Sequence, residues 1–170
     1  MSPSVIRLAR YTQTELDEIT GGAVDPFEVA ATGLKSLAKE VHFGVREQGR
    51  LVAHAGLVEV TVSVGGELIR VMGLGGVIVA PDLRGHGLAR LVVTAAVEHA
   101  RGTGAEFGLL FCWPDRMPLY RKLGWRALDG SMQVEQPDGP VGTPLRPMWI
   151  PLVEGSVWPP GPARLLSLPM

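Results

Sequence analysis

The stretch VIVAPDLRGHGLARL (Val77–Leu91) decides the fold. It starts as an apolar strand, turns through two glycines one residue apart, Gly85 and Gly87, and continues as an alanine- and leucine-rich helix. The start of a helix exposes unpaired backbone N–H groups at the positive end of the helix dipole, where an anion is stabilised. Glycine has no Cβ, so a phosphate can come close, and Arg84 adds positive charge. The stretch indicates a phosphate-bearing ligand, although glycine spacing alone fits a plain structural turn equally well.

The neighbouring residues predict a mixed sheet. From Leu88 to His99 the apolar residues recur on one helical face, and the run at 106–112 is typical of a buried strand. A strand, a helix and a second strand imply a parallel pair with a right-handed crossover. The segment 42–79 instead predicts consecutive antiparallel strands, with a two-residue turn at Gly65-Gly66. We therefore expect an α+β or mixed α/β domain.

The two ends of the chain are less regular in pattern. A strand is expected over 4–11 and a helix from Thr12 or Thr14, followed by a second helix over 25–42 that Asp25 caps. Beyond the buried strand we expect a short helix at 116–123, a strand from 124 towards 135, a loop over 136–144 and a last strand at 147–152. The proline-rich tail, residues 153–170, is expected to be irregular.

Composition narrows the possible function classes. A chain of 170 residues predicts one domain spanning 1–170, and a formal net charge of -1 gives no attraction for nucleic acid. The single cysteine excludes an internal disulfide, fits a cytoplasmic protein, and occurs without a metal-binding pattern. No apolar run reaches the length of a membrane span, and no signal peptide is recognised. We expect no nucleic acid, membrane or metal ion to be involved.

Two motifs, of which the first includes the glycine turn, carry a resemblance to a known family. Arg84, Gly87 and Ala89 fit the pattern Arg/Gln-x-x-Gly-x-Gly/Ala, and Tyr120 stands shortly before Leu123-Gly124-Trp125. In this order and at this distance the motifs resemble those of the Gcn5-related N-acetyltransferases (GNAT). This family resemblance covers the chain from Leu51 to Leu128. Within the family, the segments GRLVAHAGLV (49–58) and GGVIVAPDLRG (75–85) are most similar to the aminoglycoside 2'-N-acetyltransferases. This sequence has Leu74-Gly75-Gly76 near the position where that subfamily has an acidic residue.

The resemblance implies a fold and a cosubstrate. The fold is the GNAT acyl-CoA N-acyltransferase fold, with a mixed, mostly antiparallel central sheet of about six to seven strands and helices on both faces. Acetyl-CoA is expected in a V-shaped opening between the strand at 77–79 and the strand at 109–112. The resemblance assigns the pantetheine arm to the backbone of Val77, Ile78 and Val79. It assigns the pyrophosphate to Arg84, Gly85, His86, Gly87, Leu88 and Ala89.

Two residues are expected to carry the chemistry. Tyr120 lies in the second motif, and a phenol held near sulfur can donate a proton to a departing thiolate. Glu59 is the expected base, directly or through water, because a carboxylate in an otherwise apolar strand needs a charged or solvated outlet. An exposed strand face explains Glu59 equally well. His54 lies five residues away and would point to the opposite face, as a core histidine.

Three further residues are candidates for the site. Cys112 has no activating His or Asp pattern and reads as a buried free thiol. Trp113, and Trp158 if the tail folds back, are candidates for lining the acceptor cavity or for ordinary core packing. The leucines of the tail can cover this domain's own cleft or that of a partner, and a homodimer is expected.

The leading hypothesis is transfer of an acetyl group from acetyl-CoA to a primary amine of a small molecule, an aminoglycoside-like amine being one candidate. A non-catalytic acyl-CoA-binding module and an acetyltransferase for protein N-termini or lysines are the alternatives.

Overall fold

The computed structural model describes residues 3–170, which form a strongly bent mixed sheet with helices on both faces. In its main sheet the strand order is β1-β2-β3-β4-β5-β9-β6, and β10 pairs with β3 as an eighth strand. All neighbours are antiparallel except β4 and β5. The expected mixed, mostly antiparallel sheet is confirmed. The strands are β1 (Val5–Leu8), β2 (Val41–Glu47), β3 (Arg50–Val64), β4 (Glu67–Val79), β5 (Phe107–Cys112), β6 (Arg126–Ala127), β9 (Arg146–Pro151) and β10 (Ala163–Leu165), and a separate hairpin joins β7 (Val134–Gln136) to β8 (Gly139–Val141).

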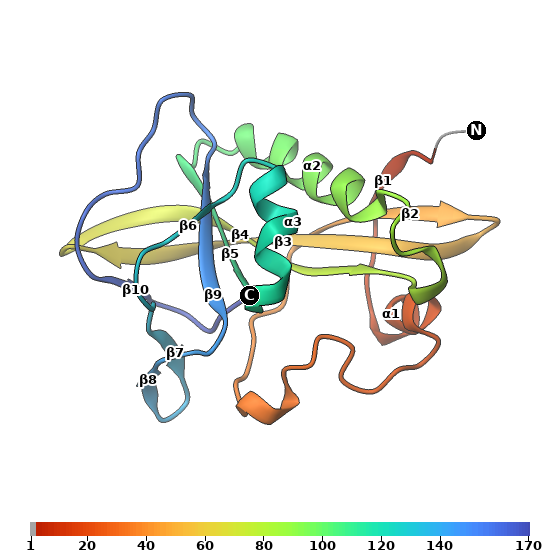
Figure 1. The fold of residues 1–170 in the computed structure, drawn as a ribbon, viewed down its shortest axis with the longest axis horizontal. Coiled ribbons are helices and arrows are strands. Elements are labelled where there is room, and N and C mark those ends of the chain that lie inside the picture. Colours follow the sequence, from red (N-terminus) through yellow and green to blue (C-terminus); the bar gives the residue numbers. More distant parts are fainter. Residues whose placement is uncertain (1–2) are drawn as a thin grey trace.

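Two helices cover opposite faces of the sheet, α1 (Gln13–Thr20) and α2 (Leu88–Arg101). Figure 1 shows α2 above the long β3–β4 hairpin and α1 below it. This arrangement explains the burial along β3, which is continuous from Leu51 to Val58 because both faces are covered. Beyond Val58, burial alternates with exposure at Glu59 and Thr61, so one face of the hairpin is open to solvent.

The hairpin turn is as expected from the sequence. Gly65 and Gly66 have φ angles of 56° and 88°, which a two-residue turn needs at both positions. A Cβ on Gly65 would also lie 2.8 Å from the carbonyl oxygen of Pro160. The turn therefore requires glycine both for its conformation and for the tail that packs against it.

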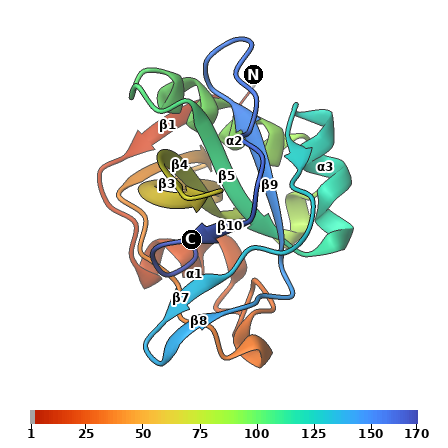
Figure 2. The same cartoon turned by 90° about the vertical axis from the view of Figure 1, so that its left-hand side faces the viewer.

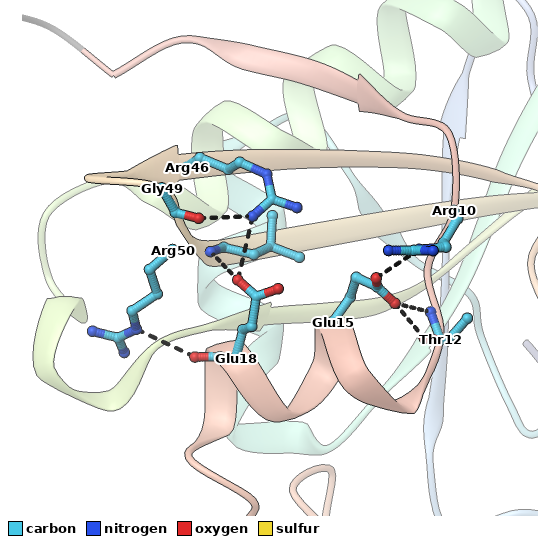
Figure 3. A network of polar contacts seen from close by, with 8 residues as sticks. Arg10, Thr12, Glu15, Glu18, Arg46, Gly49 and Arg50 are labelled. Carbon is cyan, nitrogen blue, oxygen red and sulfur yellow. Dashed lines mark hydrogen bonds and ion pairs between the residues drawn. The ribbon is translucent and has the colours of Figure 1, made fainter.

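Polar contacts hold α1 against the end of the β2–β3 hairpin (Figure 3). The Glu18 carboxylate accepts hydrogen bonds from the Leu51 N–H at 2.9 Å and from Arg46 at 3.3 Å. At the start of the helix, the Glu15 carboxylate accepts the Thr12 N–H at 2.7 Å and pairs with Arg10 at 3.0 Å. These bonds satisfy orphan donors at the first turn and fix the helix on β3.

The expected helix over 25–42 is wrong. Only one turn, η1 (Ala30–Thr32), is helical, because Asp25, Glu28 and Gly33 have positive φ angles that interrupt a right-handed helix. Asp25 still acts as a cap, since its carboxylate accepts the N–H groups of Val29 and Ala30 at 2.9 and 3.0 Å. The segment 26–39 is therefore mostly irregular, with a single helical turn, and is not a continuous helix.

The tail is more ordered than expected. It supplies β10, whose Leu165 is fully buried, and Trp158 packs edge-on against Phe107 with ring centroids 5.2 Å apart. Figure 2 shows the last residues passing back across the sheet. The Leu166 N–H donates to Thr61 and the Leu37 N–H donates to Pro169, at 3.0 and 2.7 Å. The tail thus covers this chain's own sheet.

The helices within residues 3–170 are all too short or too polar to cross a membrane. In the same residues, no three His, Cys, Asp or Glu side chains gather in a way that would hold a metal ion.

Candidate active site

The parallel strands β4 and β5 separate partway along their length. Their ladder joins Val71–Leu74 to Phe107–Leu110 and ends there, although β4 continues to Val79 and β5 to Cys112. The Ala80 N–H donates to Val52 on β3 at 2.8 Å, and backbone groups point alternately to the two sides of a strand. The N–H and C=O groups of Val77 and Val79 therefore face the open side, whereas those of Ile78 face β3. Unpaired backbone groups of this kind need a partner.

A β-bulge marks the point of separation. His54 pairs with Ile78 and Gly56 with Gly75, so that Ala55 alone faces two residues of β4, Gly76 and Val77. An extra residue in one strand bends it and increases its twist. The bulge directs the end of β4 away from β5 and so opens the site.

A hydrogen-bonded pair of histidines, of which His54 is buried, holds this bulge. The Gly76 carbonyl can only accept, so the His54 Nδ1–H donates to it at 2.7 Å. Burial lowers the pKa of His54 to about 4, so the ring is neutral and its Nε2 accepts from His42 Nδ1 at 2.9 Å. The Tyr11 ring stacks on His54 with centroids 3.5 Å apart. His54 is thus a core residue with both nitrogens bonded, as expected, and it also fixes the orientation of the bulge peptide.

The turn between β4 and α2 has the features of an anion site. Gly85 and Gly87 have φ angles of 84° and 80°, and a Cβ on either would meet no atom within 4 Å. Glycine is therefore needed here for conformation, and the space beside the turn is open. Asp82 accepts two hydrogen bonds from Arg50 on β3, at 3.0 and 3.2 Å, which hold the turn in place.

A cavity of about 560 Å³ occupies the opening between the strands. Its walls include the residues that the sequence assigned to the cosubstrate, with His86 as the exception among them. Tyr120 borders the same cavity. The lining assigned from the sequence consists of Val77, Ile78, Val79, Arg84, Gly85, Gly87, Leu88 and Ala89.

Tyr120 borders the cavity as a buried, neutral phenol. It lies in α3 (Met117–Lys122), is 7% exposed, and meets the Trp125 ring edge-on at a centroid distance of 6.3 Å. Burial, and to a smaller extent the neighbouring Cys112, raise the pKa of Tyr120 above its ordinary value, so the phenol stays protonated at neutral pH.

Glu59 does not share this site. Its carboxylate pairs with Arg70 at 2.5 Å on the open face of the hairpin, and about half of the side chain is exposed. The described part of the cavity wall does not include it. The exposed-strand alternative therefore describes Glu59, and the geometry gives no support to its expected role as a base.

The other residues weighed from the sequence divide between the cavity and the core. Cys112 lines the cavity, but burial raises the pKa of its thiol to about 11, so the reactive thiolate is disfavoured. Trp113 also lines it and donates its Nε1–H to the Phe27 carbonyl at 3.1 Å. Trp158 instead lies in a core cluster with Phe107 and Trp149.

The sequence did not predict the residues on one side of the cavity, beyond the expectation that the tail can cover the cleft. The extended segment 26–39 forms part of the wall, as do Pro169 and Met170 of the tail, and Lys39 reaches in between them. Gly73 leaves room for the Met170 side chain, whose Cγ would lie 2.5 Å from a Cβ at that position. The expected helix over 25–42 would have given the residues of that segment a different course, and no local sequence pattern indicates that 26–39, Pro169 and Met170 line the cavity.

Comparison with known proteins identifies a matching family and similar folds. A family model described as an acetyltransferase (GNAT) domain matches residues 5–128. The Escherichia coli GNAT protein YhbS, solved with CoA, is 14% identical over 98% of this chain and 92% of its own, with a TM-score of 0.62. A Brucella melitensis GNAT acetyltransferase, solved with acetyl-CoA, is 18% identical over 94% of each chain, with a TM-score of 0.55.

A third similar structure is much longer than this chain. The Kribbella flavida GCN5-related N-acetyltransferase is 24% identical over 73% of this chain, with a TM-score of 0.52, and this chain covers only 34% of it. The likeness of these structures supports the fold, and the family model covers well over half of the sequence. The chain belongs to the GNAT family of acetyltransferases.

Proposed function

We propose that the protein transfers an acetyl group from acetyl-CoA to a primary amine of a small molecule. One observation carries the proposal: the opening between β4 and β5 leads into a cavity that is bordered both by the glycine turn and by Tyr120. The structures of similar proteins with CoA and acetyl-CoA support the choice of cosubstrate.

Each part of acetyl-CoA has a matching partner. The pantetheine amides pair with the open backbone groups of Val77 and Val79, and the pyrophosphate binds at the turn 84–89 before α2. One of the β4 amides polarises the thioester carbonyl as negative charge develops on its oxygen. The amine nitrogen then attacks the carbonyl carbon, the C–S bond breaks, and the Tyr120 O–H gives its proton to the leaving thiolate. The proton lost by the amine nitrogen passes to solvent, and the Tyr120 phenolate takes a proton back from solvent.

The charge and shape of the cavity favour a small acceptor with few positive charges. Of the described lining residues only Glu28 is acidic, whereas Lys39, Arg84, Arg90 and Arg116 are basic. A polycationic aminoglycoside would find one carboxylate there, so we expect it to be a poorer acceptor than a monoamine. A protein substrate would need a long open groove, and the space here is a bounded cavity.

The proposal is tested by incubating the protein with acetyl-CoA and a panel of monoamines, amino acids, aminoglycosides and N-terminal peptides, while free thiol is measured. We expect thiol release with small monoamines and much slower release in Y120F. Turnover restricted to peptides would favour the protein-acetyltransferase alternative. CoA-dependent thermal stabilisation without thiol release from any amine would favour the binding module. Homodimer formation and cytoplasmic location stay predictions, and light scattering tests the first.

A further inference from the structure

Lys39 lies in a trough made by two glycines that face each other across β3 and β4. Gly56 and Gly75 are register partners. A Cβ on Gly56 would lie 2.6 Å from Lys39 Cγ, and a Cβ on Gly75 would lie 2.6 Å from its Cε and 3.0 Å from its Nζ. Since such distances are too short for real contacts, a side chain at either position would displace the lysine. The paired glycines thus give Lys39 an extended path across the sheet.

This path ends at the opening between the strands. Gly75 is the first residue of β4 beyond the ladder with β5, which ends at Leu74, and it is followed directly by the bulge. Lys39 lines the main cavity and also an adjoining one of about 330 Å³. Its amine therefore lies beside the part of β4 to which the thioester is assigned.

One anionic group lies near the amine without forming an ion pair with it: the carboxyl carbon of Met170 and the Lys39 Nζ each lie 3.0 Å from the position of a Cβ on Gly75. Within residues 3–170 no carboxylate approaches the amine to ion-pairing distance, and it donates only to the Leu37 carbonyl, at 3.3 Å. The groups that share the smaller cavity with it are Tyr11, His42 and His54, none of them an anion at neutral pH. Burial lowers the pKa of Lys39 to about 8, so in roughly a tenth of the molecules the Lys39 amine is uncharged at pH 7.

We propose that Lys39 is itself an acetyl acceptor, and that the protein acetylates its own Lys39 from bound acetyl-CoA. The neutral Nζ attacks the thioester carbonyl, an N–C bond forms and the C–S bond breaks. The Tyr120 phenol protonates the thiolate, and the proton lost by nitrogen returns to solvent. The products are N-acetyl-Lys39 and CoA. The inference rests on the proposed use of acetyl-CoA, and it assigns a modification site inside the cavity.

The chain offers matched internal controls, because its only other lysines are Lys35 and Lys122, both exposed. The full chain is incubated with acetyl-CoA without an added amine, and peptide mass spectrometry measures acetylation at each lysine. We expect Lys39 to be acetylated at least ten times faster than Lys35 or Lys122, at a first-order rate independent of protein concentration. The rate should rise with pH and level off above about pH 8.

Two variants separate position from reactivity. G56A keeps the amine and replaces a residue that is not itself part of the described cavity wall, but it displaces Lys39 from that wall, so acetylation at residue 39 should fall at least tenfold while the melting temperature shows that the fold persists. Y120F should slow the same step. Equal labelling of all three lysines, or unchanged labelling in G56A, would overturn the proposal. An unmodified Lys39 in a protein that acetylates panel amines would overturn self-acetylation alone, whereas failure of both reactions would also count against the proposed function.

Discussion

At the scale of the single residue, burial shifts the pKa of side chains in and behind the cavity. It raises the pKa of Tyr120, whose phenol is protonated at neutral pH, and it lowers the pKa of His54, which keeps that ring neutral to a lower pH. The sequence motif was sufficient to locate Tyr120, because the tyrosine and the Leu-Gly-Trp that follows are close together in the chain. Lys39 and the placement of Glu59 depend on contacts between distant strands, so no local pattern reports them.

Replacing Tyr120 with phenylalanine removes the proposed acid and little else, because the ring still packs against Trp125. We expect kcat to fall by about 10²–10⁴-fold, the usual contribution of a general acid. The Kd for CoA, measured by calorimetry, should change by less than about threefold. A kcat close to that of the unmodified protein would show that another group protonates the thiolate.

At the scale of the element, conformation at helix and strand ends decides what the site can bind. The turn before α2 requires glycine because Gly87 adopts a left-handed conformation as the N-cap. The need for glycine in this turn could be predicted from the sequence, because the glycine spacing and the helical pattern that follows it are local. The segment 26–39 was not, because its course follows from Asp25 and Glu28 with positive φ, which residue preferences disfavour.

Gly87→Ala tests the turn. Alanine at a φ of 80° should destabilise the fold by about 1–2 kcal/mol and weaken CoA binding, since the amides of the turn must shift. The matched control is Gly102→Ala at the other end of α2, where φ is -84° and the nearest contact of a Cβ would be an ordinary 3.5 Å. Urea unfolding should show little change in this control, and an equal loss in both variants would contradict the argument.

At the scale of the whole molecule, the fold is a mixed sheet whose tail closes over its own strands. The β3–β4 hairpin and the crossover through α2 follow from periodicity and turn chemistry, and both were predictable. The position of β9 between β5 and β6 was not predicted. The pairing of β10 with β3 was not, because a proline-rich segment with three paired residues has little local preference. Its position comes from the burial of Leu165 and Trp158.

The paired histidines predict how stability varies with pH. The folded-state pKa of His54 is about 4, below its ordinary 6.5, so between these values the unfolded chain binds more protons. The free energy of unfolding should therefore be steady between about pH 7 and pH 8 and decline as the pH falls from 6.5 towards 4, by up to about 1.4 kcal/mol per pH unit for one proton. Burial lowers the pKa of His42 as well, which adds to the same trend.

Urea titrations across this range measure the effect. H54Q should have a shallower slope, whereas H86Q, which changes an exposed histidine, should keep it. A stability that stays flat down to pH 5 would contradict the assignment of a neutral, buried His54.

The short ladder between β4 and β5 has a mechanical consequence. Within residues 3–170, the backbone ladder that joins the half-sheet β1–β4 to the half formed by β5, β9 and β6 consists of four residue pairs. A molecule lodged in the gap and bonded to either side would extend that seam by several more bonds. The same contacts would then determine both the affinity for such a molecule and the rigidity of the protein, so that the ligand-bound enzyme is also the more rigid one.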